Sequence, residues 1–315
     1  MSTATEVVTR RSAESTGRAP RRPVARRRLV SAAFVAPLVV FLLVFFAYPL
    51  GLGIAMSLQD FDVAALVRGF GDFVGLANYV DVLKSPVTQA AVVRTVIFTV
   101  LSVVFSVGIG LAIALYFNRR FPLSRFLRAL ILLPWLLPTI ASGTLFKIMF
   151  ADDGLVNKVL ATLGIIQQPV PWLTDPTAAM AALILVNIWA GISFPAVAFY
   201  TGLQDIPRDL YNAAAVDGAG RWRVFRSITF PLLRPVTMIV LVYGIIYTLK
   251  VFDIVYVMTG GGPADGTQLL STWAYTESFT NYSFGGGAAV SNILLAFSLV
   301  AASFYIWLQR RSARV

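Results

Sequence analysis

The sequence predicts an all-α, polytopic membrane protein, a bundle of six transmembrane helices with its N and C termini in the cytoplasm. Three observations support this fold class. Of the 315 residues, 57% are hydrophobic and the mean hydropathy is +0.76, whereas soluble domains are usually about 45–50% apolar. The apolar residues are gathered into long runs, and Lys and Arg collect in alternate connections between those runs.

A spanning helix needs about 20 mostly apolar residues, and six segments satisfy this requirement. They are predicted at 29–54, 91–117, 126–150, 178–202, 236–258 and 290–308. Gly and Pro inside several of them are tolerated in membrane helices. The first run is longer than the apolar core of a signal peptide and ends in Tyr48-Pro49 rather than at a small-residue cleavage site, so we expect it to be retained.

The connections differ consistently in charge, which predicts the orientation. The basic connections carry Arg119, Arg120, Arg125 and Arg128, then Arg208, Arg221, Arg223, Arg226 and Arg234, and Arg310, Arg311 and Arg314 after the last run. The other connections carry mainly acidic residues. The positive-inside rule therefore places both termini in the cytoplasm. Residues 1–28 are polar and basic and predict a disordered cytoplasmic tail, residues 29–309 a transmembrane domain, and 310–315 a cytoplasmic C-terminal tail.

Composition excludes several function classes. The chain has neither Cys nor His, which excludes disulfides, thiolate chemistry and His-ligated metals. The net charge of +11 does not predict nucleic-acid binding. The basic residues flank apolar runs, and these runs leave no soluble domain that could bind nucleic acid. No segment matches the G-x-x-x-x-G-K-[ST] phosphate loop, and the Gly-Gly-Gly-Pro run at 260–263 lacks its Lys. The sequence therefore gives no phosphate loop with which this chain could hydrolyse ATP.

The connection at 205–235 predicts two short helices instead of a plain loop. Pro207 fits the start of the first helix, and Gly218 and Gly220 lie where the chain must turn. The apolar positions are Leu210, Ala213, Ala214 and Val216, then Trp222, Phe225 and Ile228, with Pro231 and Pro235 leading into the next run. Short helices are unstable alone in water. Their apolar faces must pack on this protein's own helix ends, lie in the lipid interface, or dock into a groove on a cytoplasmic partner; the pattern alone leaves these alternatives open.

This connection resembles a known family. The sequence Tyr-Asn-Ala-Ala-Ala-Val-Asp-Gly-Ala at 211–219, followed by Phe225, Ile228, Pro231 and Pro235, is similar to the EAA loop of binding-protein-dependent permeases, the membrane subunits of ATP-binding-cassette importers. The resemblance covers nearly all of the chain after the tail. Its other parts are Tyr48-Pro49, the stretch 73–76 with Asn78-Tyr79, Gly154 with Asn157, and Phe252-Asp253 through Tyr256, Thr259 and Gly261-Gly262-Pro263. These resemble the sugar-permease branch and the maltose-type first permease subunit, without that subunit's extra leading spans and large outer domain.

The resemblance implies the docking interpretation of the loop. In the family, this loop forms coupling helices that sit in a cleft of the ATPase subunit and switch the gate when the ATPase dimer closes. The implied coupling residues are Asn212, Ala213, Ala214, Asp217, Gly218 and Ala219. Asn212 departs from the family's usual Glu and cannot form an ion pair. The implied partners are a second, paralogous permease, two ATPase subunits, an extracytoplasmic solute-binding protein and membrane lipid. This non-catalytic subunit of the bacterial inner (plasma) membrane would bind no cofactor, with ATP and Mg on the ATPase subunits.

The predicted spans contain candidates for contact with a solute. Ionisable groups inside spans are costly and are functional candidates; Lys147, Lys250 and Asp253 qualify. Lys147 can also reach the membrane interface, and Lys250 and Asp253, spaced i, i+3, can neutralise each other on one helix face. Tyr243, Tyr247 and Lys250 form one stripe, and Asn187, Gly191 and Phe194 share one face of the fourth run. Both sets fit solute lining or interhelical packing.

Three function classes compete. The first is a permease subunit of an ATP-driven importer, which moves a sugar or related polar solute by alternating access. The second is a stand-alone secondary transporter or channel, for which internal repeats and embedded carboxylates are typical; we find no convincing repeat and one strong carboxylate candidate, Asp253. The third is a membrane enzyme, which the lack of His, Cys and clustered acids disfavours. The connection at 205–235 discriminates between them, because only the first class explains it.

Overall fold

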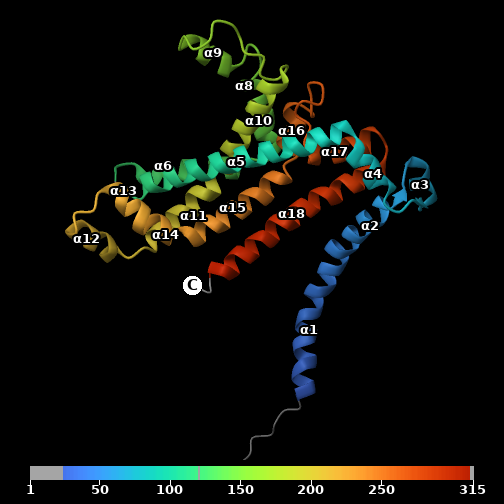
Figure 1. The fold of residues 1–315 in the computed structure, drawn as a ribbon, viewed down its shortest axis with the longest axis horizontal. Coiled ribbons are helices and arrows are strands. Elements are labelled where there is room, and N and C mark those ends of the chain that lie inside the picture. The colour runs from blue at the N-terminus through green and yellow to red at the C-terminus, as the bar shows by residue number, and fades with distance from the viewer. Residues whose placement is uncertain (1–23, 120, 313–315) are drawn as a thin grey trace, which may run out of the picture. The chain divides into compact units, whose positions relative to one another are not determined.

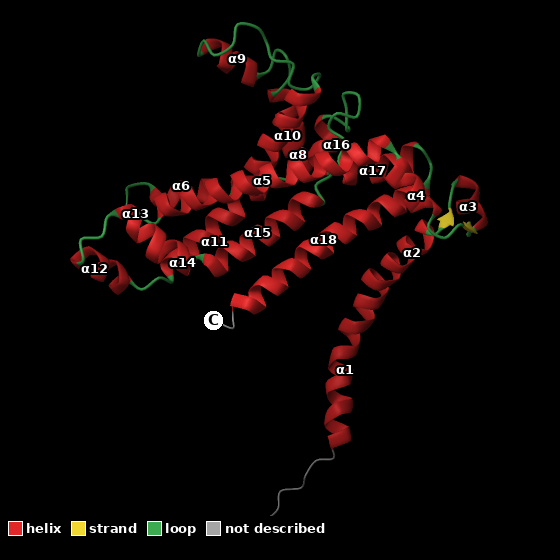
Figure 2. Cartoon of the chain, viewed as in Figure 1, coloured by secondary structure: helices red, strands yellow, loops and turns green. Residues whose placement is uncertain are grey.

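The computed structural model of the protein describes residues 24–119 and 121–312, and helices dominate it (Figure 2). The predicted all-α class is confirmed. The first half of the chain contains α1 (Val24–Leu42), the π-helical turn η1 (Leu43–Ala47), α2 (Tyr48–Ser57), α3 (Val63–Arg68), α4 (Ala77–Lys84), α5 (Pro86–Phe117), α6 (Ser124–Ile131), α7 (Leu133–Leu136), α8 (Thr139–Met149) and α9 (Leu155–Thr162). Strands β1 (Gln59–Asp60) and β2 (Asp72–Phe73) form a short antiparallel hairpin between α2 and α4.

The second half continues with α10 (Pro176–Gly191), α11 (Ser193–Gln204), α12 (Arg208–Val216), α13 (Arg221–Val224), the π-helical turn η2 (Phe225–Thr229), α14 (Phe230–Leu232), α15 (Arg234–Leu249), α16 (Asp253–Met258), α17 (Leu270–Tyr275), the π-helical turn η3 (Thr276–Thr280) and α18 (Phe284–Ser312) (Figure 1). The chain forms two compact units, Met1–Leu52 and Gly53–Val315. The first unit contains α1 and η1, where Phe41 and Phe45 pack with ring centroids 4.9 Å apart. The second unit contains the helix bundle.

Four helices of the described chain are long and apolar enough to cross a membrane. They run over Ala33–Ser57, Pro86–Phe117, Pro176–Gln204 and Phe284–Trp307. The segments Arg221–Leu232 and Arg234–Leu249 pass the same test only together, and they are bent by 67°. Helix α1 begins at Val24, before the predicted start at residue 29, and α18 continues to Ser312, into the predicted tail at 310–315. The remainder of the tails, residues 1–23 and 313–315, lies outside the described residues, as does Arg120.

The third predicted span, 126–150, is not one helix. It consists of α6, α7 and α8, and the chain between α7 and α8 is extended at Leu137, where ψ is 134°. Pro134 and Pro138 explain the interruption, because each lacks a backbone N–H and Pro138 disfavours a helical conformation at Leu137. The prediction of a continuous helix here is wrong, because an apolar stretch of sufficient length was allowed to outweigh two prolines.

The fifth predicted span, 236–258, is interrupted as well. Helix α15 ends at Leu249, and α16 begins at Asp253 after Phe252, whose φ is −128°. Lys250 and Asp253 therefore do not lie on one helix face, and the prediction that they do so is wrong. The fourth predicted span is divided only at Ile192, between α10 and α11, and this residue keeps helical backbone angles (φ −73°, ψ −28°).

The apolar core of the second unit is divided into three clusters. One joins α8, α10 and α16 through buried side chains such as Leu183, Val186, Ile254 and Val255. A second joins α4, α5, α17 and α18 around Trp273. The third joins the ends of α5 and α11 to α15: Ala114, Phe199, Leu203, Ile206, Leu233 and Val240. Helix α5 contributes to all three clusters, through Phe98, Ala91 and Ala114 respectively.

Small residues allow the helices to approach closely. Helices α5 and α11 cross at Gly110, where an added β-carbon would lie 2.5 Å from Pro195 Cβ and 3.0 Å from the backbone nitrogen of Ala196. Close approach at small residues is typical of membrane helix pairs. The same helix carries a buried polar stripe, Thr88, Thr95, Thr99, Ser102 and Ser106. The interior of the bundle is therefore closely packed and partly polar.

Candidate functional site

The connection at 205–235 folds as two short helical segments joined by a tight turn, as the sequence predicts. Helix α12 ends at Val216, and Gly218 has φ of +68°, a conformation that glycine adopts without the steric penalty of a side chain. The backbone N–H of Ala219 donates to Ala214 O over 2.9 Å, and that of Gly218 to Ala215 O over 3.1 Å. These bonds satisfy carbonyls at the end of α12. The second segment then runs from Arg221 to Leu232.

Two contacts fix the base of this loop to the bundle. Ile206 is buried in the apolar cluster of α5, α11 and α15, and Tyr211 packs against that cluster. The Tyr211 hydroxyl also lies 3.2 Å from Thr229 Oγ1 and joins the two segments. These contacts answer part of the question left open above, because one side of α12 packs on the protein's own helix ends.

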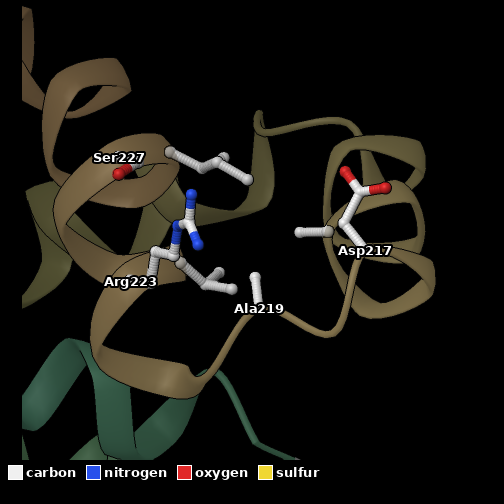
Figure 3. Close-up of a pocket in the computed structure, with 7 residues that line it drawn as sticks. Asp217, Ala219, Arg223 and Ser227 are labelled. Carbon is white, nitrogen blue, oxygen red and sulfur yellow. The ribbon is translucent and has the colours of Figure 1, made fainter.

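The tip of the loop remains exposed. Val216 is 89% exposed and Trp222 72% exposed, although Trp222 stacks on Phe225 with centroids 5.6 Å apart. Between the segments lies a hollow of about 380 Å³, shown in Figure 3. Its lining residues are Ala214, Asp217, Ala219, Arg223, Val224, Ser227 and Ile228. In Figure 3 the Arg223 side chain extends into the space between the segments, across from Asp217.

The predicted coupling residues thus occupy four different environments. Ala214 is buried, while Asp217 and Ala219 line the hollow and Gly218 forms the turn. The remaining two, Asn212 and Ala213, are exposed on α12. The loop presents both charged and apolar groups away from the bundle.

A second set of candidates lies on the helices of the bundle, where the structure brings three of the predicted aromatic residues together. Phe194 of α11 and Tyr243 of α15 have ring centroids 4.1 Å apart, and Tyr243 and Tyr247 stack with centroids 5.9 Å apart. Trp135 of α7, which the sequence analysis did not single out, packs edge-on against Phe194 at 6.2 Å. We call Trp135, Phe194, Tyr243 and Tyr247 the aromatic cluster. Such a surface offers flat apolar faces and hydroxyl groups.

Asn187 and Gly191 lie on α10 between the apolar clusters. Asn187 is 2% exposed; its Nδ2 donates to Thr248 Oγ1 over 3.4 Å, and its Oδ1 has no hydrogen-bond partner among the described residues. An unpaired buried acceptor is costly. A β-carbon at Gly191 would lie 3.9 Å from Ser106 Cβ, so this glycine faces the polar stripe of α5. Asn187 thus bonds α10 to α15 and retains an acceptor for a further donor.

The ionisable candidates have partners that differ from those predicted. Asp253 Oδ2 accepts a hydrogen bond of 2.6 Å from Thr139 Oγ1 of α8, and Lys250 is exposed at the end of α15. Lys147 Nζ donates to the carbonyl oxygen of Val257 over 3.0 Å. The sequence analysis missed Thr139 as a partner of Asp253, because Thr139 belonged to a span expected to be one helix. Pro138, directly before it, was the available signal that the helix is interrupted there. Arg94 was also missed, although it is a charged residue inside the predicted second span.

The remaining motifs of the resemblance hold loops at the helix ends. Asn157 is buried: its Nδ2 donates to the carbonyls of Asp152 (3.1 Å) and Val170 (3.0 Å), and its Oδ1 accepts from Val170 N (3.1 Å) and Trp172 Nε1 (3.0 Å). Asn78 Nδ2 donates to the carbonyls of Ser57 and Gln59. The side chains of these asparagines bond to backbone groups where the chain is irregular. Buried polar groups need such hydrogen-bond partners.

Comparisons with known proteins agree with this geometry. Residues 106–314 match the family described as binding-protein-dependent transport system inner membrane component. The trehalose/maltose transport system permease protein MalF of Thermococcus litoralis is 37% identical over 276 residues, which cover 87% of this chain and 91% of the relative. The sulfoquinovosyl glycerol transport system permease protein SmoG of Agrobacterium fabrum is 34% identical over 281 residues, 89% of this chain and 90% of the relative.

The lactose transport system permease protein LacF of Rhizobium radiobacter is similarly 34% identical, over 88% of this chain and 94% of the relative. A crystal structure of a bacterial ABC transporter involved in the import of the acidic polysaccharide alginate matches the fold. The TM-score is 0.77 at 22% identity, over 91% of this chain and 97% of that chain. Both the sequence and the arrangement of helices therefore place the chain with membrane subunits of this kind.

Proposed function

The chain belongs to the family of binding-protein-dependent transport system inner membrane components, and from this premise we propose that it imports a sugar or related polar solute by alternating access. It is a multi-pass membrane permease subunit, which decides against the alternative of a stand-alone secondary transporter or channel. Relatives named for trehalose/maltose, sulfoquinovosyl glycerol and lactose support the solute class. We propose six spans with both termini in the cytoplasm, two of the spans being broken helices.

The observation that carries the proposal is the two-helix loop at 205–235. Its base is packed and bonded, but its tip exposes Val216 and Trp222 beside a hollow. Large apolar side chains on a short helix are not stabilised by water and indicate a docking surface. The proposed occupant is an ATPase subunit, which would take its contacts from Asn212, Ala213, Asp217 and Gly218. ATP and Mg would bind there and not to this chain.

The loop can transmit movement because it is continuous with the bundle. The segment Arg221–Leu232 leads through Leu233 into α15, which carries Tyr243 and Tyr247. Leu233 is 1% exposed, in the same apolar cluster as Ile206. A displacement of the loop therefore acts on a helix that carries half of the aromatic cluster.

The aromatic cluster is the proposed solute contact. Sugars present hydroxyls and apolar C–H faces, and tyrosine can meet both. Asn187 would add an amide oxygen for a solute hydroxyl, because that oxygen is unpaired, and Gly191 leaves room beside Ser106. The complete importer would contain a second, paralogous permease, two ATPase subunits and an extracytoplasmic solute-binding protein.

A reconstitution experiment tests the function. The chain is co-purified with the permease, ATPase and binding protein encoded beside it, inserted into liposomes, and supplied with radiolabelled trehalose, maltose or lactose. We expect ATP-dependent accumulation of at least one of these solutes, only with binding protein present. Solute transport by the purified chain without ATP would refute the proposal.

The orientation is tested separately. The chain has no Cys, so Val216→Cys introduces a single thiol at an exposed position of the loop. A membrane-impermeant maleimide should label this thiol in inside-out vesicles and not in intact cells. Labelling from outside would contradict docking to a cytoplasmic ATPase.

A further inference from the structure

Two of the predicted spans are interrupted, and a side-chain hydrogen bond connects the interruptions. The chain leaves helical geometry between α7 and α8 and between α15 and α16. Close by, Ser193 at the start of α11 donates to Ile131 O over 2.6 Å, at the end of α6. Thr139 at the start of α8 bonds to Asp253 at the start of α16. The interruptions therefore lie beside one another in the bundle, and we call this region the break layer.

Two further side-chain bonds at or near the interruptions satisfy backbone carbonyls. Trp135 N donates to Leu132 O, so the carbonyl of Ile131 is free to accept from Ser193. The carbonyl of Val251, in the gap between α15 and α16, accepts from Ser271 Oγ. Irregular backbone at membrane depth requires such replacements, because lipid supplies none. The interruptions are thus bonded to neighbouring elements of the bundle and are not frayed helix ends.

The break layer separates two packed regions. On one side α8 and α16 pack with the first part of α10 around Leu183, Val186 and Ile254. On the other side α11 and α15 pack with the end of α5 around Phe199, Leu203 and Val240. Phe194 and Tyr243 lie on the second side of the layer, at the start of α11 and within α15. The proposed solute contacts therefore adjoin the junction between the two regions.

Helices α8 and α16 are connected at three points along their length. Thr139 bonds to Asp253 at their starts, and Lys147 bonds to Val257 O farther along. Between these points Gly143 lets the helices touch: a β-carbon there would lie 3.4 Å from Val257 Cβ and 3.5 Å from Ile254 Cα. Figure 1 shows α8 beside α16. Two short helices with ties at both ends and contact between form one body.

We infer that α8 and α16 form a single gate that pivots at the break layer, and that the Thr139–Asp253 hydrogen bond holds the two halves of this gate together. This inference rests on the proposed import function and adds a role for Thr139, which no motif suggested. Asp253 is then a positioning residue, and its carboxylate is used by Thr139 instead of by the solute. Without the bond, the two helices would pivot separately and the gate would close incompletely during the ATP cycle.

The first test removes the hydroxyl of Thr139. In the reconstituted importer, Thr139→Val keeps the side-chain shape, and we expect solute moved per ATP hydrolysed to fall by about tenfold, the change expected when a hydrogen bond to a charged group is lost. Thr139→Ser retains the hydroxyl and should restore the ratio. The solute concentration for half-maximal transport should not change. An unchanged ratio in Thr139→Val, or a raised half-maximal concentration alone, would overturn the inference and indicate a solute ligand.

The second test locks the gate covalently. The Cβ positions of residues 143 and 257 lie within reach of a disulfide, so Gly143→Cys with Val257→Cys is oxidised in the assembled complex. One rigid gate predicts that the oxidised and reduced forms transport at the same rate. Loss of transport on oxidation, restored by reduction, would show that α8 and α16 move against each other and would overturn the inference. If wild type itself transports nothing, the import function fails instead.

Discussion

The loop at 205–235 and the break layer are both made of short helices joined by irregular backbone, yet they treat their polar and apolar groups in opposite ways. In the break layer, side chains of Thr139, Ser193 and Ser271 take up polar groups inside the bundle. In the loop, Val216 and Trp222 are exposed. Backbone within a membrane must be satisfied internally, whereas a surface loop can leave its contacts to a partner.

This difference teaches how to separate structural from functional residues in the same chain. Substitution of a residue in the break layer should destabilise the bundle or uncouple solute transport from ATP hydrolysis. A residue at the tip of the loop should leave the isolated chain unchanged and affect only the assembled importer. For the substitutions below, the stability of the chain and its transport are compared. The two measurements together show whether a residue acts within the bundle or only in the assembled importer.

The largest effect is expected at Gly218, the turn of the loop. A β-carbon there would meet no heavy atom within 4 Å among the described residues, so Gly218→Trp does not clash with this chain. It should nevertheless abolish transport, because the added ring occupies the proposed docking surface and the backbone at φ of +68° resists a bulky residue. Transport in liposomes and membrane insertion are measured together.

Gly218→Asn is the matched control, because Asn adopts this left-handed conformation more readily than other residues. It should retain ATPase assembly and much of the transport. Full transport by Gly218→Trp would remove the distinction between loop and bundle, and so would failure of that variant to insert.

The opposite outcome is expected at Gly110, where α5 meets α11. Gly110→Ala places a carbon 2.5 Å from Pro195 Cβ, and overpacking of this kind costs about 1–3 kcal/mol. The melting temperature of the detergent-solubilised chain should fall. Gly108→Ala on the same helix is the control, since a β-carbon there has no neighbour within 4 Å among the described residues. Equal melting temperatures for the two variants would contradict close packing at Gly110.

The sequence predicted the helical class, the apolar runs and the two-segment loop because these depend on local patterns: run length, Pro207 and Gly218. It did not predict the break layer. An apolar run has the same composition whether or not it is interrupted, and interruption is stable only when a distant residue supplies a hydrogen bond. Ser193 and Thr139 do so across 62 and 114 residues of sequence. Pro138 and the pair Lys250 and Asp253 were local signals of a break, but only the tertiary bonds explain why the chain accepts one.

A smaller, local effect is expected at Asn157. This residue lies outside the break layer, but its side chain also bonds to backbone groups where the chain is irregular. Asn157→Ala leaves the backbone N–H of Val170 and the indole N–H of Trp172 without their acceptor. A fully buried unpaired group costs about 1–3 kcal/mol, and these part-buried groups cost less because water can reach them. The loop 163–175 should open while the bundle stays folded. Limited proteolysis would show faster cleavage in this loop, with an unchanged melting temperature. Asn212→Ala, on the exposed side of α12, should not change either measurement.

The smallest effect is expected at Tyr79, and it asks whether bonds at the helix ends matter as much as those in the break layer. The Tyr79 hydroxyl lies 2.8 Å from Ser57 Oγ and 3.0 Å from Asn292 Nδ2, and Asn292 also donates to Ser57 Oγ over 3.0 Å. Tyr79→Phe removes one hydroxyl from a group of three hydrogen-bonded side chains, and the bond between Asn292 and Ser57 remains. The free energy of unfolding should therefore fall by only about 1 kcal/mol. A melting temperature a few degrees lower, with transport unchanged, is the expected result, and the exposed Tyr282 changed to Phe is the control. If Tyr79→Phe uncoupled transport as strongly as Thr139→Val, the pivot of the gate would extend to the ends of the helices and would not be confined to the break layer.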